Sequence, residues 1–90
     1  NNNNLQDKLK NDLLEYYKKY IEIKNLNLSL EEFSNLNIVD MLKFIVMISP
    51  FENNIKQMCL ELESNTELYE NVLSTLKIEV NSVEQNFSIN

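Results

Sequence analysis

Residues 64–87 read SNTELYENVLSTLKIEVNSVEQNF, and this stretch decides the fold class. Ser64 and Glu67 have the spacing of a capping box, in which each side chain bonds a free backbone N–H at the start of a helix. Apolar residues then recur at intervals of four and three, at Tyr69, Leu73, Leu76, Val80, Val83 and Phe87. This is the spacing of a coiled-coil seam. It predicts one helix of about 23 residues, roughly 34 Å long.

Shorter helices are predicted before this one. Residues 5–24 carry a single apolar stripe at helical spacing, with most lysines on the other faces. A capping box that starts at Ser29 predicts a short helix over 30–35. Residues 38–48 follow Asn37, which is a suitable N-cap. The length and the Met, Leu and Lys content of 38–48 favour a helix, with a buried strand as the alternative.

The one proline of the chain lies at a predicted helix start. Proline is accepted at the first helical position, because the N–H that it lacks would have no partner there. Ser49 before Pro50 and Glu52 after it have the spacing of another capping box. We therefore predict a fourth helix that begins at Pro50 and continues to about Leu62.

These elements predict an all-α protein, a helical bundle of four to five helices with a long C-terminal helix. No segment alternates apolar and polar residues strictly enough to predict a strand. We expect residues 1–4 to be a disordered lead and residues 5–90 to form a single helical domain. The predicted core consists of Phe44, Ile45, Ile48, Phe51, Ile55, Met58, Leu62, Leu73 and Leu76.

Composition argues against catalysis by this segment. The chain has no Gly, so it cannot build a glycine-rich phosphate loop, and no His, the commonest general base and a frequent zinc ligand. Arginine is absent as well. Acid pairs such as Glu61 and Glu63 are expected to be a solvated helix face, and Cys59 to be a buried, unreactive thiol. We predict no catalytic residues, no metal site and no cofactor in this segment.

Charge restricts the class of partner. Fourteen acidic residues against eight lysines give a net charge of −6. This balance disfavours binding to nucleic acid and to anionic membranes. The longest apolar run has five residues, at 44–48, whereas a bilayer span needs about twenty. The single cysteine rules out an internal disulfide and fits a reducing compartment, or one indifferent to redox; we expect an intracellular location.

The last helix supplies the predicted contact site. Its later seam residues lie more than two turns beyond the first ones, where shorter helices are not expected to cover them. We predict that Val80, Val83 and Phe87 are exposed or buried against another chain, as in a homo-oligomer. Packing of this seam within the chain is the alternative.

The chain from Ser49 onward resembles the helical half of the Lon protease N-terminal domain, also called the LON substrate-binding domain. The resemblance rests on the order and spacing of Pro50, Lys56-Gln57, Leu60-Glu61, the cap at Ser64, Glu67, Tyr69-Glu70, Val72-Leu73 and the long helix through Ile78-Glu79-Val80 to Ile89. With the upstream helices it covers about 80 residues. Leu68 stands where the family often has Arg, and Ile55 where it usually has an acid. The β-rich first half of that domain is not in this chain.

The resemblance implies a non-catalytic role in substrate recognition and assembly for an ATP-dependent AAA+ protease that acts in protein quality control. The partners would be unfolded protein substrates and neighbouring subunits. ATP, Mg²⁺ and the serine endopeptidase activity would belong to modules further along a full-length Lon. The location would be the mitochondrial matrix for a eukaryotic Lon and the cytoplasm otherwise. Two alternatives stay open: a short LON-domain protein without protease, and a free-standing helical adaptor that acts by protein–protein interaction.

Overall fold

Four α-helices and one short 3-10 helix make up the described part of the chain. The computed structural model describes the backbone of residues 2–89 and the side chains of residues 5–84. The elements are α1 (Asn2–Lys24), the 3-10 helix η1 (Glu32–Asn35), α2 (Ile38–Ile48), α3 (Asn53–Glu61) and α4 (Asn65–Ile89). No strand occurs among these residues, so the all-α prediction is confirmed. Of the lead predicted to be disordered over residues 1–4, the structure places residues 2–4 in α1.

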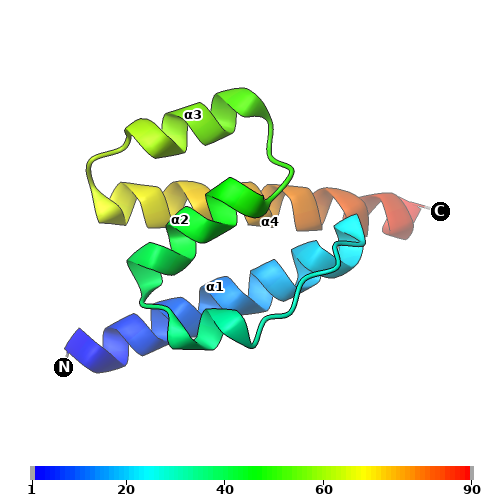
Figure 1. Cartoon of the computed structure of the whole chain (residues 1–90). Helices are drawn as coiled ribbons and strands as arrows, with labels where there is room; N and C mark the ends of the chain where they lie inside the picture. Colours follow the sequence, from blue (N-terminus) through cyan, green and yellow to red (C-terminus); the bar gives the residue numbers. More distant parts are fainter. Residues whose placement is uncertain (1, 90) are drawn as a thin grey trace.

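The two long helices form the base on which the others pack. α1 and α4 lie side by side and make the most extensive contact between any two described helices (Figure 1). α2 crosses this pair, and α3 packs against α2 and α4 on the side away from α1. None of the described helices combines the length with the apolar character that a membrane crossing requires.

Local side-chain bonds set two helix starts as predicted. The Asn37 Oδ1 accepts the backbone N–H of Asp40 at 2.9 Å, and its Nδ2 donates to the Asp40 carboxylate at 3.0 Å. The Ser64 Oγ likewise accepts the backbone N–H of Glu67 at 3.3 Å, and α4 begins at Asn65. Among the described residues the Glu67 carboxylate makes no bond back to Ser64, so only half of the predicted capping box forms. Both caps join residues three positions apart, which is why the sequence pattern reveals them.

The end of α1 shows how the chain manages without glycine. Asn25 adopts a left-handed backbone conformation, with a φ of 54°. The N–H of Asn25 donates to the carbonyl of Glu22, and the N–H of Leu26 donates to the carbonyl of Ile21. These two bonds make a Schellman motif, in which asparagine takes the position that glycine usually fills.

Two predicted capping boxes are wrong. α3 begins at Asn53 and not at Pro50, and its N-cap Glu52 makes no side-chain cap bond. Ser49 instead ends α2, and its hydroxyl bonds the hydroxyl of Tyr17 at 2.8 Å inside the protein. The Ser49 side chain is thus held in the core, and it makes no cap bond to α3. At the other box, Ser29 accepts the N–H of Glu31, two residues on, and a 3-10 turn follows in place of the predicted helix.

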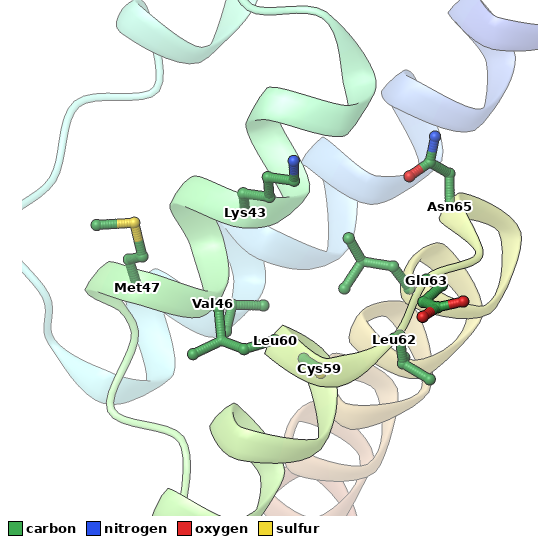
Figure 2. Close-up of a pocket in the computed structure, with 9 residues that line it drawn as sticks. Lys43, Val46, Met47, Cys59, Leu60, Leu62, Glu63 and Asn65 are labelled. Carbon is green, nitrogen blue, oxygen red and sulfur yellow. The ribbon is translucent and has the colours of Figure 1, made fainter.

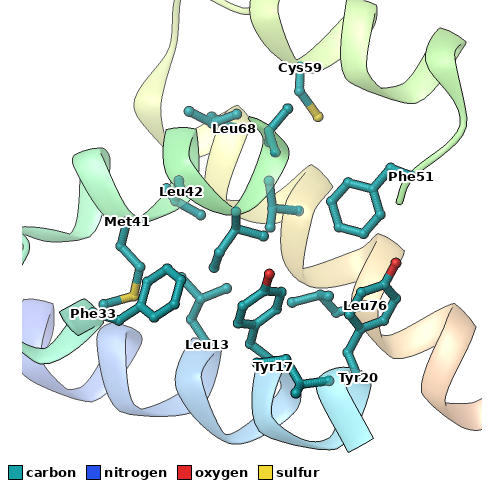
Figure 3. Packing of buried hydrophobic residues seen from close by; sticks show 14 of the residues in the cluster. Leu13, Tyr17, Tyr20, Phe33, Met41, Leu42, Phe51, Cys59, Leu68 and Leu76 are labelled. Atoms are coloured by element: carbon teal, nitrogen blue, oxygen red, sulfur yellow. The ribbon is translucent and has the colours of Figure 1, made fainter. Parts of the chain in front are cut away.

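The core lies where α1, α2 and α4 meet (Figure 3). Its centre is aromatic. The rings of Tyr17 and Tyr20 stack at 5.9 Å, Phe33 packs edge-on against Tyr17 at 5.6 Å, and Phe51 contacts Tyr20 at 5.5 Å. The remaining buried apolar residues are Leu13, Ile21, Met41, Leu42, Ile45, Val46, Cys59, Leu68, Val72, Leu76 and Val80.

The predicted core is confirmed in part. Ile45, Phe51 and Leu76 are buried, while Ile48, Ile55, Leu62 and Leu73 are half-buried and pack against the core. Phe44 and Met58 were expected inside, but both are exposed, Phe44 by 40%. The rings of Phe44 and the buried Phe33 lie nearly perpendicular, with centroids 5.4 Å apart, while the neighbouring Ile45 occupies the inward face of α2.

Two buried tyrosine hydroxyls have different surroundings. The Tyr17 hydroxyl is paired with Ser49, whereas the Tyr20 hydroxyl has no hydrogen-bond partner among the described protein groups. Burial raises the pKa of both side chains above the usual value for tyrosine, and the Glu79 carboxylate raises that of Tyr20 further. Both therefore stay neutral and act as packing groups.

Candidate functional site

The contact site predicted on α4 is not assembled as expected. Val80 is only 1% exposed and belongs to the core of this chain, so the prediction for this residue is wrong. Val83 is half-buried, and the side chain of Phe87 lies outside the described residues. The physical reason is the length of α1, which runs beside α4 far enough for Lys24 to pair with Glu79 at 3.2 Å. α1 therefore covers the seam as far as Val80.

Cys59 and the acidic pairs occupy the positions expected of structural residues. Cys59 is buried, and burial raises the pKa of its thiol. Glu61 and Glu63 are exposed, and Glu61 accepts a bond from Gln57 one turn before it. In the described part of the chain, no three acidic or cysteine side chains come together as a metal site would require.

The Cys59 thiol should react slowly in the native protein. A thiolate is the nucleophilic form, and burial with a raised pKa lowers both its access and its population. We expect alkylation of Cys59 by iodoacetamide at pH 8 to be at least about tenfold slower than in urea-unfolded protein, measured by mass spectrometry. Equal rates would show that the thiol is exposed and reactive.

A groove lies between α2, α3 and the start of α4, and is here called the α2–α3–α4 groove (Figure 2). Its volume is about 240 Å³. Three other hollows on the described surface are more open, and one of them, beside α4, is larger at about 360 Å³. The groove is lined by Lys43, Val46, Met47, Cys59, Leu60, Leu62, Glu63, Asn65 and Leu68.

Each wall of the groove comes from a different element. Lys43, Val46 and Met47 are spaced three and four residues apart, which places them on one face of α2. The α3 wall is formed by Cys59 and Leu60. The groove exists because α2 and α3 diverge after the tight link that follows Ser49, and α4 closes the far end (Figures 1 and 2).

The walls of the groove are apolar and accessible. Met47 is 68% exposed on α2, and Leu60 is 65% exposed on α3. Large apolar side chains that stand at a hollow in this way mark a contact surface more often than isolated ones do. A methionine also adapts its shape to different partners, because its side chain is unbranched and flexible. The groove is smaller than the roughly 300–1,000 Å³ of a typical small-molecule pocket, so side chains of another polypeptide fit it better.

Sequence reasoning missed the residues of this groove, although a signal was present. Met47 and Leu60 are apolar but fall beside the apolar stripes of their helices. An apolar residue that lies outside the apolar stripe of its helix points away from the core. Two such residues on neighbouring helices predict an accessible apolar patch. Met47 belongs to this surface, whereas Met41 lies in the core.

No family model, no curated protein and no solved structure matches this chain. The resemblance to the Lon N-terminal domain therefore rests on the sequence pattern described above.

Proposed function

We propose that this chain is a non-catalytic module that binds other polypeptides, with the α2–α3–α4 groove as the contact site. The observation that carries the proposal is the pair Met47 and Leu60, two large apolar side chains exposed on opposite walls of an apolar hollow. Covering them would remove apolar surface from water, which is the main driving force of protein association. The groove sits between packed helices, so it presents this surface without a large rearrangement.

The more specific form of the proposal is a recognition and assembly segment of a Lon-type protease. The sequence pattern from Pro50 to Ile89 supports it, and so does a groove that suits apolar side chains, because unfolded substrates expose such side chains. In that case ATP, Mg²⁺ and proteolysis belong to other modules, and the protein works in the mitochondrial matrix or the cytoplasm. Neighbouring subunits would be further partners, in keeping with a homo-oligomer.

The rival forms are a free-standing helical adaptor and a short LON-domain protein. Both would use the same groove, so binding alone does not separate them from a protease segment. The reading frame of the gene does. A glycine-rich phosphate loop and a Ser-Lys dyad downstream of Asn90 would support the Lon-type protease, whereas a stop codon near Asn90 would support the adaptor.

Binding of an unfolded polypeptide tests the contact site. The probe is a fluorescein-labelled protein that has been reduced and carboxymethylated, followed by anisotropy. We expect the double variant Met47→Ser/Leu60→Ser to bind at least about tenfold more weakly than the unaltered protein. Each change removes an apolar group that binding would bury. The fold should be kept, since both side chains are mostly exposed.

A matched control comes from Ile78 and Leu5, which are 67% and 58% exposed on other surfaces. The double variant Ile78→Ser/Leu5→Ser removes similar apolar groups and should bind like the unaltered protein. Equal losses in both double variants would mean that binding is a general property of exposed apolar residues. The assignment of the groove would then fail.

A further inference from the structure

The α2–α3–α4 groove carries two opposite charges that have no partner in the described part of the chain. Lys43 belongs to the α2 wall, and Glu63 belongs to the link between α3 and α4 (Figure 2). No hydrogen bond or ion pair joins either side chain to another described residue. The two groove charges are therefore free to pair with a bound molecule.

The position of these charges restricts what the groove accepts. A segment whose apolar side chains enter between α2 and the α3–α4 link brings one of its flanks near Lys43 and the other near Glu63. A flank of opposite charge gains from this arrangement, whereas a like charge placed against either residue is disfavoured. The net charge of −6 favours cationic partners over the whole molecule, but Lys43 opposes a cation at its own wall.

We propose that the occupant of the groove is an amphipathic helix whose apolar stripe is flanked by acidic residues on one side and basic residues on the other. The acidic flank lies against Lys43, and the basic flank lies against Glu63. This selection rests on the proposed function, since it presupposes that the groove binds polypeptide. A helix is the fitting shape, because grooves between helices receive the apolar face of a helix through residues three and four apart.

Three synthetic 16-residue helical peptides test the selection. They share one apolar face and differ only in their flanks, which are Glu on one side and Lys on the other, Lys on both, or Glu on both. Turning a bound helix end for end exchanges its flanks, so the mixed peptide satisfies both groove charges in one of its two directions. We expect it to bind about three to ten times more tightly than either of the others, measured by fluorescence anisotropy at low salt.

Reversing either groove charge should change which of the three peptides binds most tightly. Lys43→Glu makes both walls acidic and should make the all-Lys peptide the best binder. Glu63→Lys makes both walls basic and should select the all-Glu peptide. Lys8→Glu and Glu70→Lys change the net charge of the protein by the same amounts, at exposed positions that do not line the groove. These two control variants should keep the preference for the mixed peptide.

The other outcomes separate this inference from the proposed function. If all three peptides bind equally, and Met47→Ser/Leu60→Ser abolishes that binding, the groove is a contact site and the charge selection is wrong. If no peptide and no unfolded protein binds, both proposals fail. Sedimentation identifies one more outcome. If the protein is a dimer, if Met47→Ser/Leu60→Ser is a monomer, and if the mixed peptide does not dissociate the dimer, the occupant is a second copy of this chain. The inference is then overturned.

Discussion

Ile45→Ala should destabilise the protein by about 2–5 kcal/mol, the usual cost of emptying a buried isoleucine site. Ile45 is fully buried on the inward face of α2, so its removal leaves a cavity among the residues of α1 and α4. The free energy of unfolding is measured by urea denaturation followed by circular dichroism. Ile45→Val, with an expected loss of about 0.5–1.5 kcal/mol, keeps the measurement possible if the alanine variant does not fold.

The adjacent residue provides the control. Phe44 is larger than Ile45 but 40% exposed, and its main aromatic contact is with Phe33. We expect Phe44→Ala to cost only about 1–2 kcal/mol, because much of its surface is already in water. A greater loss for Phe44→Ala than for Ile45→Ala would show that α2 is rotated from the orientation described here.

Local interactions made part of this fold predictable. The bounds of α2 follow from the mostly apolar composition of residues 38–48 and from the cap at Asn37. The start of α4 follows from the bond between Ser64 and Glu67. In each case the groups that set the helix boundary lie within one turn of each other. The sequence of the segment itself is therefore enough to predict that boundary.

The wrongly predicted features depend on contacts between residues that are far apart in the sequence. The box at Ser49 has the right local spacing, but its hydroxyl bonds Tyr17, which is 32 residues away. The choice between two partners for one hydroxyl depends on how α1 packs, and no local pattern contains this. The same holds for Val80, whose burial depends on the length of α1 beside it.

The buried face of α4 also differs from the predicted seam. Its fully covered residues are Leu68, Val72, Leu76 and Val80, each four positions after the last. Residues four apart form the commonest ridge through which two helices pack at an angle, whereas the alternating spacing belongs to helices that supercoil. Both sets of apolar residues are present in the sequence, so only the packing against α1 and α2 reveals which one faces inward.

The groove was hidden for a related reason. Its lining comes from three elements that are separated in sequence, and its exposed members Met47 and Leu60 are residue types that normally lie inside. A composition that is ordinary for a globular chain gives no indication of which apolar residues remain outside. The accessible patch follows only from the angle at which α2, α3 and α4 meet.

Tyr17→Phe and Tyr20→Phe should have opposite effects on stability, although the two rings stack on each other. Tyr17→Phe removes the partner of a buried serine hydroxyl and leaves Ser49 unpaired in the core. We expect a loss of about 1–3 kcal/mol, the cost of a buried polar group without a partner. Tyr20→Phe removes a hydroxyl that has no protein partner, so it should leave stability unchanged or raise it by about 1 kcal/mol.

The comparison isolates the hydroxyl groups, because each substitution keeps the ring and its packing. Tyr16→Phe is a further control at a half-buried position and should change the free energy of unfolding by less than about 0.5 kcal/mol. Denaturation of all three variants at pH 7 gives the differences directly. If Tyr20→Phe costs as much as Tyr17→Phe, the Tyr20 hydroxyl makes a stabilising bond in solution, most simply through a bridging water. The contrast drawn between the two tyrosines would then be wrong.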